Sequence, residues 1–168
     1  MAYFCYLCAM KVAFTGHREC TVDINALLEA IEVLYRQGYT VFMSGMAEGF
    51  DLAAAEAVLQ LKERCDGIEL ISVIPFEGHR ATMSTRDKMR YDAICLQADQ
   101  IVTLADGYSH QVYAQRNDYL IDNSDIVLCY YSGRKRSGTG YTVCRGLKKG
   151  LKVINLYADG EQITFFGQ

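Results

Sequence analysis

A glycine-rich segment at positions 44–51 holds the residues best suited to bind a phosphate group. It reads Ser44-Gly45-Met46-Ala47-Glu48-Gly49-Phe50-Asp51 and stands between a short apolar run and an alanine-rich helical pattern. Backbone N–H groups at a helix N-terminus, left open by glycine, bind anions well. The segment matches neither the P-loop nor the dinucleotide fingerprint. Glu48 would repel a phosphate and is predicted to face a ribose hydroxyl or a base. Asp51 either binds a ribose hydroxyl as well or is an ordinary residue at the N-terminus of a helix, without a role in binding.

Two further loops follow apolar runs and carry cations. The first, Thr15-Gly16-His17-Arg18, combines a hydroxyl, a glycine that permits close backbone approach and a guanidinium suited to phosphate or carboxylate. The second, Pro75-Phe76-Glu77-Gly78-His79-Arg80, places an aromatic ring where it would stack on a base. Each loop also has a plainer interpretation: a turn with a solvated arginine in the first, and a proline-bounded loop over a buried phenylalanine in the second.

A fourth loop ends where a helix is expected to begin. It reads Gly133-Arg134-Lys135-Arg136-Ser137-Gly138-Thr139-Gly140, and its glycines, hydroxyls and three cations again describe a phosphate site. A flexible loop with a solvated charge run would have the same composition. Upstream, Arg116 and Asn117 lie in a helical pattern from which they would reach a ligand. The alternative for them is a set of surface ion pairs worth about 0–1 kcal/mol.

The elements that must position these loops alternate along the chain. Strands are predicted at 9–14, 40–43, 69–74, 100–104, 126–130 and 152–156, with an additional edge strand at 163–165. Helices are predicted at 24–34, 52–64, 83–97, 112–121 and 139–149. This order predicts an α/β, Rossmann-like open sheet, mostly parallel, with helices on both faces. Ligands of such sheets bind beyond the carboxyl ends of the strands, where strand order reverses.

The composition limits the classes of partner. The chain has 168 residues and a net charge of -3, which gives no general attraction to nucleic acid or anionic membrane. No apolar run approaches the roughly 18–20 residues that span a bilayer, and residues 1–10 lack the features of a signal peptide. One domain over residues 1–168, with a core at about 10–156, is expected because no linker or repeat is visible.

Seven cysteines are scattered along the chain. Cys5 and Cys8 form a Cys-x-x-Cys pair, but a zinc site would need a second pair of ligands, and none is evident. We therefore expect no metal and predict reduced cysteines in a cytoplasmic protein. Exposed tyrosines such as Tyr130 and Tyr131 would suit an interface between copies of the chain.

Together, the motifs resemble a known family. The chain carries, in this order, Phe14-Thr15-Gly16-His17-Arg18, the segment 44–51, Ile74-Pro75-Phe76, Gln115-Arg116-Asn117 and Ser137-Gly138-Thr139-Gly140. In this it resembles the YpsA-like family of the SLOG superfamily, from about Met10 to Leu156. The resemblance implies a Rossmann-like fold and a nucleotide-derived ligand, without a settled activity.

Two distant SLOG relatives suggest functional directions. The cytokinin-activating phosphoribohydrolases (lysine-decarboxylase-like proteins) carry Pro-Gly-Gly-x-Gly-Thr-x-x-Glu, and here the glutamate position holds Thr142. A hydroxyl cannot supply the carboxylate that N-glycoside cleavage needs, so this departure argues against an enzyme. The segment 44–51 is also similar to a stretch of the DNA-processing protein DprA, which binds single-stranded DNA. This chain shows no interleaved aromatic and basic groove, so nucleic acid binding is a minor alternative.

The expectation is a domain that binds or senses a nucleotide or nucleotide-sugar and requires no cofactor. Phosphate is expected at residues 45–49 and 138–140, with its charge balanced by Arg18 and Arg116. Phe76 is expected to stack on the base.

The alternative is a nucleotide N-glycosidase that uses Glu48 or Asp51 as its carboxylate, and these two residues are the candidate catalytic groups. The candidate binding residues are Thr15, Gly16, His17, Arg18, Ser44, Gly45, Met46, Ala47, Glu48, Gly49, Asp51, Pro75, Phe76, Arg116, Asn117, Gly138, Thr139 and Gly140.

Overall fold

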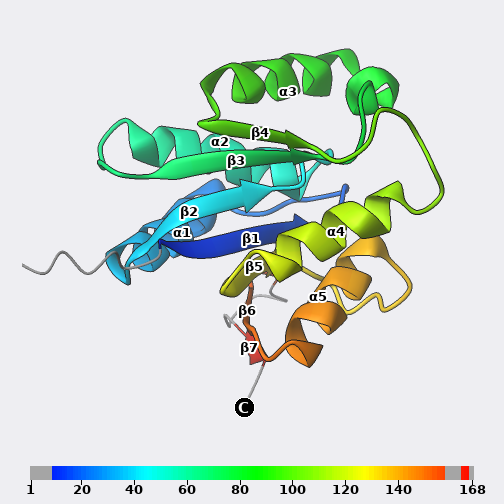
Figure 1. Cartoon of the computed structure of the whole chain (residues 1–168). Coiled ribbons are helices and arrows are strands. Elements are labelled where there is room, and N and C mark those ends of the chain that lie inside the picture. The colour runs from blue at the N-terminus through cyan, green and yellow to red at the C-terminus, as the bar shows by residue number, and fades with distance from the viewer. Residues whose placement is uncertain (1–8, 158–163, 167–168) are drawn as a thin grey trace, which may run out of the picture.

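A computed structural model describes residues 9–157 and 164–166. Within them, seven strands form one sheet in the order β4-β3-β2-β1-β5-β6-β7 (Figure 1). All neighbouring pairs are parallel except β6 and β7. The strands are β1 (Met10–Gly16), β2 (Tyr39–Ser44), β3 (Glu69–Ile74), β4 (Gln100–Thr103), β5 (Ile126–Tyr130), β6 (Lys152–Asn155) and β7 (Thr164–Phe166). The predicted Rossmann-like α/β class with a mostly parallel open sheet is confirmed.

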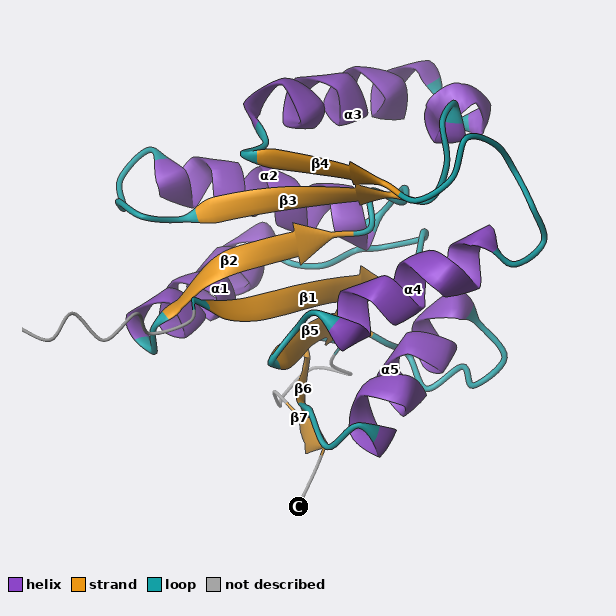
Figure 2. Cartoon of the chain, viewed as in Figure 1, coloured by secondary structure: helices purple, strands orange, loops and turns teal. Residues whose placement is uncertain are grey.

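Helices cover both faces of the sheet (Figure 2). They are α1 (Ile24–Arg36), α2 (Phe50–Lys62), α3 (Thr85–Gln97), α4 (Val112–Asp122) and α5 (Gly138–Lys148), with a short 3-10 helix, η1 (His79–Thr82). The largest apolar cluster lies between the sheet and α1, α2 and α3. Two smaller clusters lie on the opposite face, beneath α4 and α5. The central strands are therefore buried on both sides, which is why they read as continuous apolar runs.

The first helix shows how local sequence sets the element boundaries. The Asp23 carboxylate accepts a hydrogen bond from the Asn25 N–H at 2.9 Å and caps the helix. Leu27, Ile31 and Leu34 then recur at helical spacing and are buried. Gly38 follows at a φ of 95°, which glycine adopts without strain. Capping, periodicity and termination thus all favour the helix that the sequence predicts.

Most element boundaries differ from the prediction by one or two residues, and one predicted exposure is also different. Helix α3 begins at Thr85 instead of position 83, because the Ser84 hydroxyl accepts a hydrogen bond from the Asp87 N–H at 3.1 Å and caps it. The edge strand is one residue later than predicted. The expectation that Tyr130 is exposed is wrong. Its ring packs against Phe50 and Tyr157, and only 8% of its surface is exposed.

In the part of the chain that the structure describes, no helix combines the length and the apolarity needed to cross a membrane. The cysteines in that part are free thiols, at positions 20, 65, 95, 129 and 144. The Cys5 and Cys8 pair lies outside the described residues.

The strand order fixes where a ligand site is expected. From β1, the chain runs outward through β2, β3 and β4, and it then returns to place β5 on the other side of β1. The loops after β1 and β5 therefore leave the sheet next to each other. Rossmann-like sheets bind ligands at such a reversal point.

Candidate functional site

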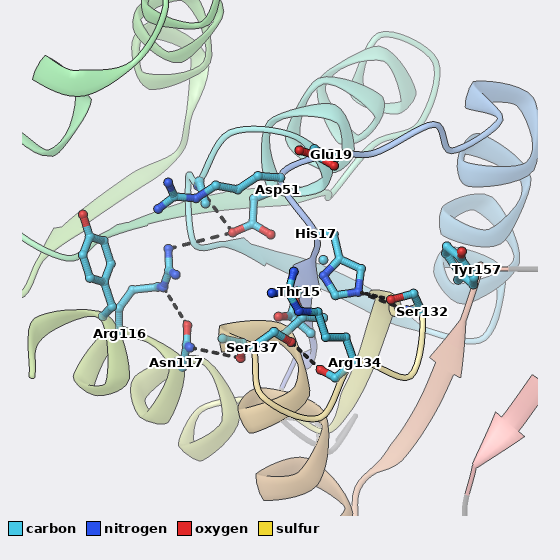
Figure 3. Close-up of a pocket in the computed structure, with 16 residues that line it drawn as sticks. Thr15, His17, Glu19, Asp51, Arg116, Asn117, Ser132, Arg134, Ser137 and Tyr157 are labelled. Atoms are coloured by element: carbon cyan, nitrogen blue, oxygen red, sulfur yellow. Dashed lines mark hydrogen bonds and ion pairs between the residues drawn. The ribbon is translucent and has the colours of Figure 1, made fainter.

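A cavity of about 570 Å³ opens at the carboxyl ends of β1 and β5. This volume lies in the range of roughly 300–1,000 Å³ that is typical of small-molecule sites. Its walls come from the segments after β1, β2, β5 and β6, from α4, and from the first turns of α2 and α5 (Figure 3). We refer to it as the central cavity.

Ten of the eighteen candidate binding residues line the central cavity: Thr15, Gly16, His17, Arg18, Ala47, Asp51, Arg116, Asn117, Gly138 and Thr139. The other eight candidates lie outside its lining: Ser44, Gly45, Met46, Glu48, Gly49, Pro75, Phe76 and Gly140. Of the two carboxylates proposed for chemistry, Asp51 thus faces the cavity and Glu48 does not. The roles of these residues in binding stay predictions.

The loop after β2 uses its glycines to pack against the protein itself. A Cβ on Gly45 would lie 2.7 Å from Nη1 of Arg116, and a Cβ on Gly49 would lie 2.2 Å from the Arg18 carbonyl oxygen. Gly49 has a φ of 84° and Met46 a φ of 57°. The Ser44 hydroxyl accepts from the Met46 N–H at 3.2 Å and donates to the Asp51 carbonyl at 2.9 Å. The loop is therefore a folded support for Asp51 more than an open phosphate cradle.

We expect Gly49→Ala to destabilise the protein clearly more than Gly67→Ala. Both glycines have a positive φ, but a Cβ at Gly67 meets no atom within 4 Å. The control therefore carries only the cost of the left-handed backbone. The clash with the Arg18 carbonyl adds roughly 1–3 kcal/mol, the usual cost of overpacking. Urea unfolding of both variants measures the difference, and equal losses would show that the β1 and β2 loops do not pack as described.

Asp51, in the first turn of α2, is the most unusual group of the central cavity. Only 4% of its surface is exposed. Its Oδ2 accepts a hydrogen bond from the Ala47 N–H at 3.4 Å and lies 3.9 Å from Nη1 of Arg116. Its Oδ1 has no hydrogen-bond partner among the described residues. Burial raises the pKa of Asp51 to about 6, although Arg116, the Ala47 N–H and Arg18 oppose this rise.

Arg116 and Asn117 connect the two ends of the cavity from α4. The Arg116 guanidinium donates through Nη1 to the Gly45 carbonyl and through Nε to the Asn117 Oδ1, at 2.8 Å in the latter case. Asn117 in turn donates through Nδ2 to the Gly138 carbonyl at 3.5 Å. Both side chains are buried, so the alternative of surface ion pairs is wrong for them. The chain of hydrogen bonds holds the β2 loop and the start of α5 in fixed relation (Figure 3).

The first turn of α5 offers free donors to the cavity. The Ser137 hydroxyl caps the helix by accepting from the Gly140 N–H at 3.0 Å, and it donates to the Arg134 carbonyl at 2.7 Å. Within the described residues, the N–H groups of Gly138 and Thr139 have no acceptor. No acidic residue stands in this turn. The positive end of the helix is therefore open to an anion.

Phe76 lies beside the cavity instead of in it. Its ring packs edge-on against His79, Tyr108 and Tyr113, at centroid distances of 5.7, 5.8 and 6.1 Å. Of these residues, only Tyr113 lines the cavity. Phe76 was predicted to stack on a base, but it does not line the cavity. Tyr113 does line it and is therefore better placed than Phe76 for that contact.

Thr142 occupies the position at which phosphoribohydrolases carry a glutamate. It is fully buried, and its hydroxyl donates to the Gly138 carbonyl at 2.9 Å within α5. It takes no part in lining the cavity. The residue thus stabilises the helix start from inside the protein.

Several residues that line the cavity are absent from the sequence-based candidates. For some of them, the position in the sequence could have indicated a place in the site. Ser132 follows β5 as His17 follows β1, and these strands are neighbours. Tyr113 lies one helical turn before Arg116 and Asn117. Arg134 and Ser137 stand in a loop that was predicted as a phosphate site, without being singled out. Glu19 and Tyr157 also line the cavity, and no pattern in the sequence marks them.

The comparison with protein families decides the assignment. The YpsA family model, described as the YspA SLOG family, matches residues 10–153. The chain belongs to this family. The match runs from the start of β1 into β6, so it includes every residue that lines the central cavity except Tyr157.

Two proteins of similar sequence have names that state no activity. The uncharacterized SPbeta prophage-derived protein YoqJ of Bacillus subtilis (strain 168) is 30% identical over 128 residues, covering 68% of this chain and 74% of YoqJ. The UPF0398 protein YpsA of the same organism is 29% identical over 107 residues, covering 60% of this chain and 57% of that protein. The chain thus aligns with less than two thirds of YpsA itself.

Solved structures share the fold at low identity. DNA processing protein A from Helicobacter pylori, whose structure concerns single-stranded DNA binding, superposes with a TM-score of 0.63 at 20% identity. The alignment covers 87% of this chain and 64% of that one. The structural-genomics target TM1055 superposes with a TM-score of 0.55 at 17% identity, covering 86% of this chain and 72% of that one. At these identities the likeness shows the fold alone.

Proposed function

We propose that the chain binds an anionic, nucleotide-type small molecule in the central cavity. One observation carries the proposal: the cavity joins two free N–H donors, at Gly138 and Thr139, with a buried free acceptor, Oδ1 of Asp51. A buried carboxylate oxygen without a hydrogen-bond partner is rare in folded proteins, and a donor on a bound ligand would satisfy it. A nucleoside phosphate offers the complementary pair, since its phosphate accepts hydrogen bonds and its ribose hydroxyls donate them.

The phosphate end is defined by charge as well as by hydrogen bonds. Arg18 and Arg134 line the cavity, are exposed, and form no salt bridge with the residues that the structure describes. Both guanidiniums are thus available to an anion. Arg116 is engaged by Gly45, Asn117 and Asp51, so its part is to position the site. The expected charge balance therefore falls to Arg18 and Arg134.

The ribose end is defined by Asp51. A hydroxyl that donates to Oδ1 would satisfy the buried oxygen, and the adjacent guanidinium of Arg116 would keep the carboxylate ionised at neutral pH. Tyr113 supplies a ring for the base. No resident cofactor is needed for this mode of binding, and the cytoplasm, where nucleotides are abundant, is the proposed compartment.

Binding is best tested with nucleoside monophosphates and ADP-ribose by isothermal titration calorimetry. For the tightest ligand, Arg134→Ala is expected to weaken the affinity about tenfold, the value of one charge-assisted hydrogen bond. Arg136→Ala is the matched control, since Arg136 stands two residues away in the same loop and does not line the cavity. Equal affinities for Arg134→Ala and Arg136→Ala, or no binding of any nucleotide, would contradict the proposed site.

A nucleotide N-glycosidase is the second candidate, and one observation favours it. Asp51 is a buried carboxyl with a free oxygen that lines the cavity, as a group that stabilises an oxocarbenium-like centre must be. The same nucleotide panel tests this activity when free base is followed by chromatography. Base release by the wild type that disappears in Asp51→Asn supports the enzyme; binding without release supports the sensor.

Single-stranded DNA is a minor alternative suggested by the fold of DNA processing protein A. Binding of that kind depends steeply on salt concentration. An affinity for a single-stranded oligonucleotide that falls between 50 and 200 mM salt would favour this alternative, and six phosphate contacts correspond to roughly a 10³-fold fall.

The sequence also led us to expect that copies of the chain associate with one another. Gel filtration over a series of protein concentrations would test this expectation.

A further inference from the structure

A serine and a histidine meet inside the central cavity in the arrangement of a nucleophile and its base. The Ser132 hydroxyl lies 2.9 Å from Nε2 of His17, and the Ser132 backbone nitrogen lies 3.0 Å from the same atom (Figure 3). Both residues line the cavity. The binding role described above uses neither of them.

The position of the contact follows from the sheet. Gly16 of β1 pairs with Tyr130 of β5 in the parallel register, so the residues that follow these strands leave the sheet together. The His17 N–H donates to the Tyr130 carbonyl at 3.2 Å, and the His17 ring packs on Tyr131 at a centroid distance of 5.9 Å. The main chain of His17 is thus fixed by its hydrogen bond to β5, and its imidazole is held by the contacts with Tyr131 and the Ser132 N–H, because a base must be oriented toward its nucleophile.

The hydrogen bonds also identify the protonation state of the imidazole. A backbone N–H can only donate, so the Ser132 N–H requires Nε2 of His17 to be an acceptor without a proton. The ring proton is then on Nδ1. With Nε2 free of a proton, the Ser132 hydroxyl is the donor in the contact at 2.9 Å, and it shares the single lone pair of Nε2 with the Ser132 N–H. Burial and the nearby Arg134 lower the pKa of His17, which favours the same neutral form at pH 7.

We propose that Ser132 is a nucleophile, that His17 is its general base, and that the pair hydrolyses a carboxylic ester carried by an anionic small molecule. The preference for an anionic ester rests on the proposed function, because the guanidiniums of Arg18 and Arg134 would hold the anion. The reactivity of Ser132 is independent of the proposed function, since it follows from the contact with His17. The free N–H groups of Gly138 and Thr139 are the donors available in the cavity to a negatively charged carbonyl oxygen.

The reaction proceeds in two balanced steps. In the first, Oγ of Ser132 bonds to the ester carbonyl carbon while its proton passes to Nε2 of His17. The bond from that carbon to the alcohol oxygen then breaks, and the alcohol leaves with the proton from Nε2. In the second, a water molecule adds to the acyl carbon and gives a proton to Nε2. The bond to Oγ breaks, the acid leaves, and Ser132 regains its proton.

The reactivity is tested with a biotin fluorophosphonate, which phosphonylates activated serines. We expect one adduct per chain, on Ser132, located by tandem mass spectrometry. His17→Gln should slow labelling by at least 100-fold, the usual contribution of a general base. The glutamine amide oxygen can still accept the Ser132 N–H, so thermal unfolding should stay close to that of the wild type. Ser109→Ala, at an exposed serine outside the cavity, should label like the wild type.

Two results would overturn the nucleophile: no wild-type labelling above that of Ser132→Ala, or equal labelling rates for wild type and His17→Gln. The substrate class is tested separately with 4-nitrophenyl acetate and 4-nitrophenyl 3-phosphonopropanoate. We expect kcat/KM to be at least tenfold higher for the anionic ester, and the preference to be lost in Arg134→Ala. Turnover of both esters without preference would reject the anion site while leaving Ser132 as the nucleophile.

Discussion

Replacing Arg116 with methionine is expected to lower the free energy of unfolding by about 3–5 kcal/mol at pH 7.5, the cost of removing one partner from a buried ion pair. The Arg116 side chain is 10% exposed, and the Asp51 side chain opposite it is 5% exposed. Methionine keeps much of the apolar volume but leaves the carboxylate without its cation. The Gly45 carbonyl and the Asn117 amide oxygen lose their donor as well. Urea unfolding of both proteins measures the change.

A surface arginine provides the control for this substitution. Arg36 is 72% exposed on its side chain and pairs with Glu32 one helical turn away. Arg36→Met is expected to cost only about 0.3–0.5 kcal/mol, as exposed pairs of this spacing do. The double variant Arg116→Met with Asp51→Asn should recover part of the loss, because no buried charge then remains. A double variant as unstable as the sum of the single variants would show that Arg116 and Asp51 do not interact.

The fold was largely predictable because each strand and helix is marked by the period of its apolar residues. The central strands read as short apolar runs since both of their faces are covered, and α1 reads as a helix since Leu27, Ile31 and Leu34 recur on one face. Boundaries were less predictable. A start such as that of α3 depends on which of several polar residues caps the helix, and Ser84 has a competitor in every nearby hydroxyl and carboxylate.

Only part of the site was predictable from the sequence. The glycines explain why some predicted residues line the cavity and others do not. Glycine serves equally to bring backbone close to a ligand and to let protein segments approach one another. The sequence cannot separate these uses. At Gly45 and Gly49 the structure shows the second use, against Arg116 and the Arg18 carbonyl. At Gly138 the nearest atom to an added Cβ is 3.8 Å away, so that glycine leaves the start of α5 open to the cavity.

Contacts between residues on neighbouring strands were also not predictable from the sequence. His17 was selected from its own loop, whereas Ser132 becomes a candidate only when β5 is known to lie beside β1. Reading the two strands as neighbours requires the strand order, because 115 positions separate the two residues. The order of strands is a property of the packed sheet, and no local pattern in the sequence determines it.

Asp51→Asn is expected to change how stability depends on pH. Because burial raises the pKa of Asp51 from 3.8 to about 6, the folded protein holds this proton more tightly than the unfolded chain does. The stability of the wild type therefore falls as pH rises from about 4 to about 6, and the effect is complete above that window. Asparagine does not titrate, so the variant lacks this fall. A shift of about two pKa units corresponds to roughly 3 kcal/mol.

The difference between the two proteins is therefore the quantity to measure. Relative to the wild type, Asp51→Asn should gain about 2 kcal/mol in unfolding free energy between pH 4 and pH 7.5. Urea unfolding at four pH values gives both curves, and Asp106→Asn, at an exposed aspartate, should follow the wild type. Parallel curves for Asp51→Asn and the wild type would mean that the carboxyl is not held in a buried site. The same variant should bind the nucleotide about tenfold more weakly, because the charge-assisted hydrogen bond to the ligand is lost. A carboxylate that lowers stability at neutral pH yet strengthens binding is a group retained for function.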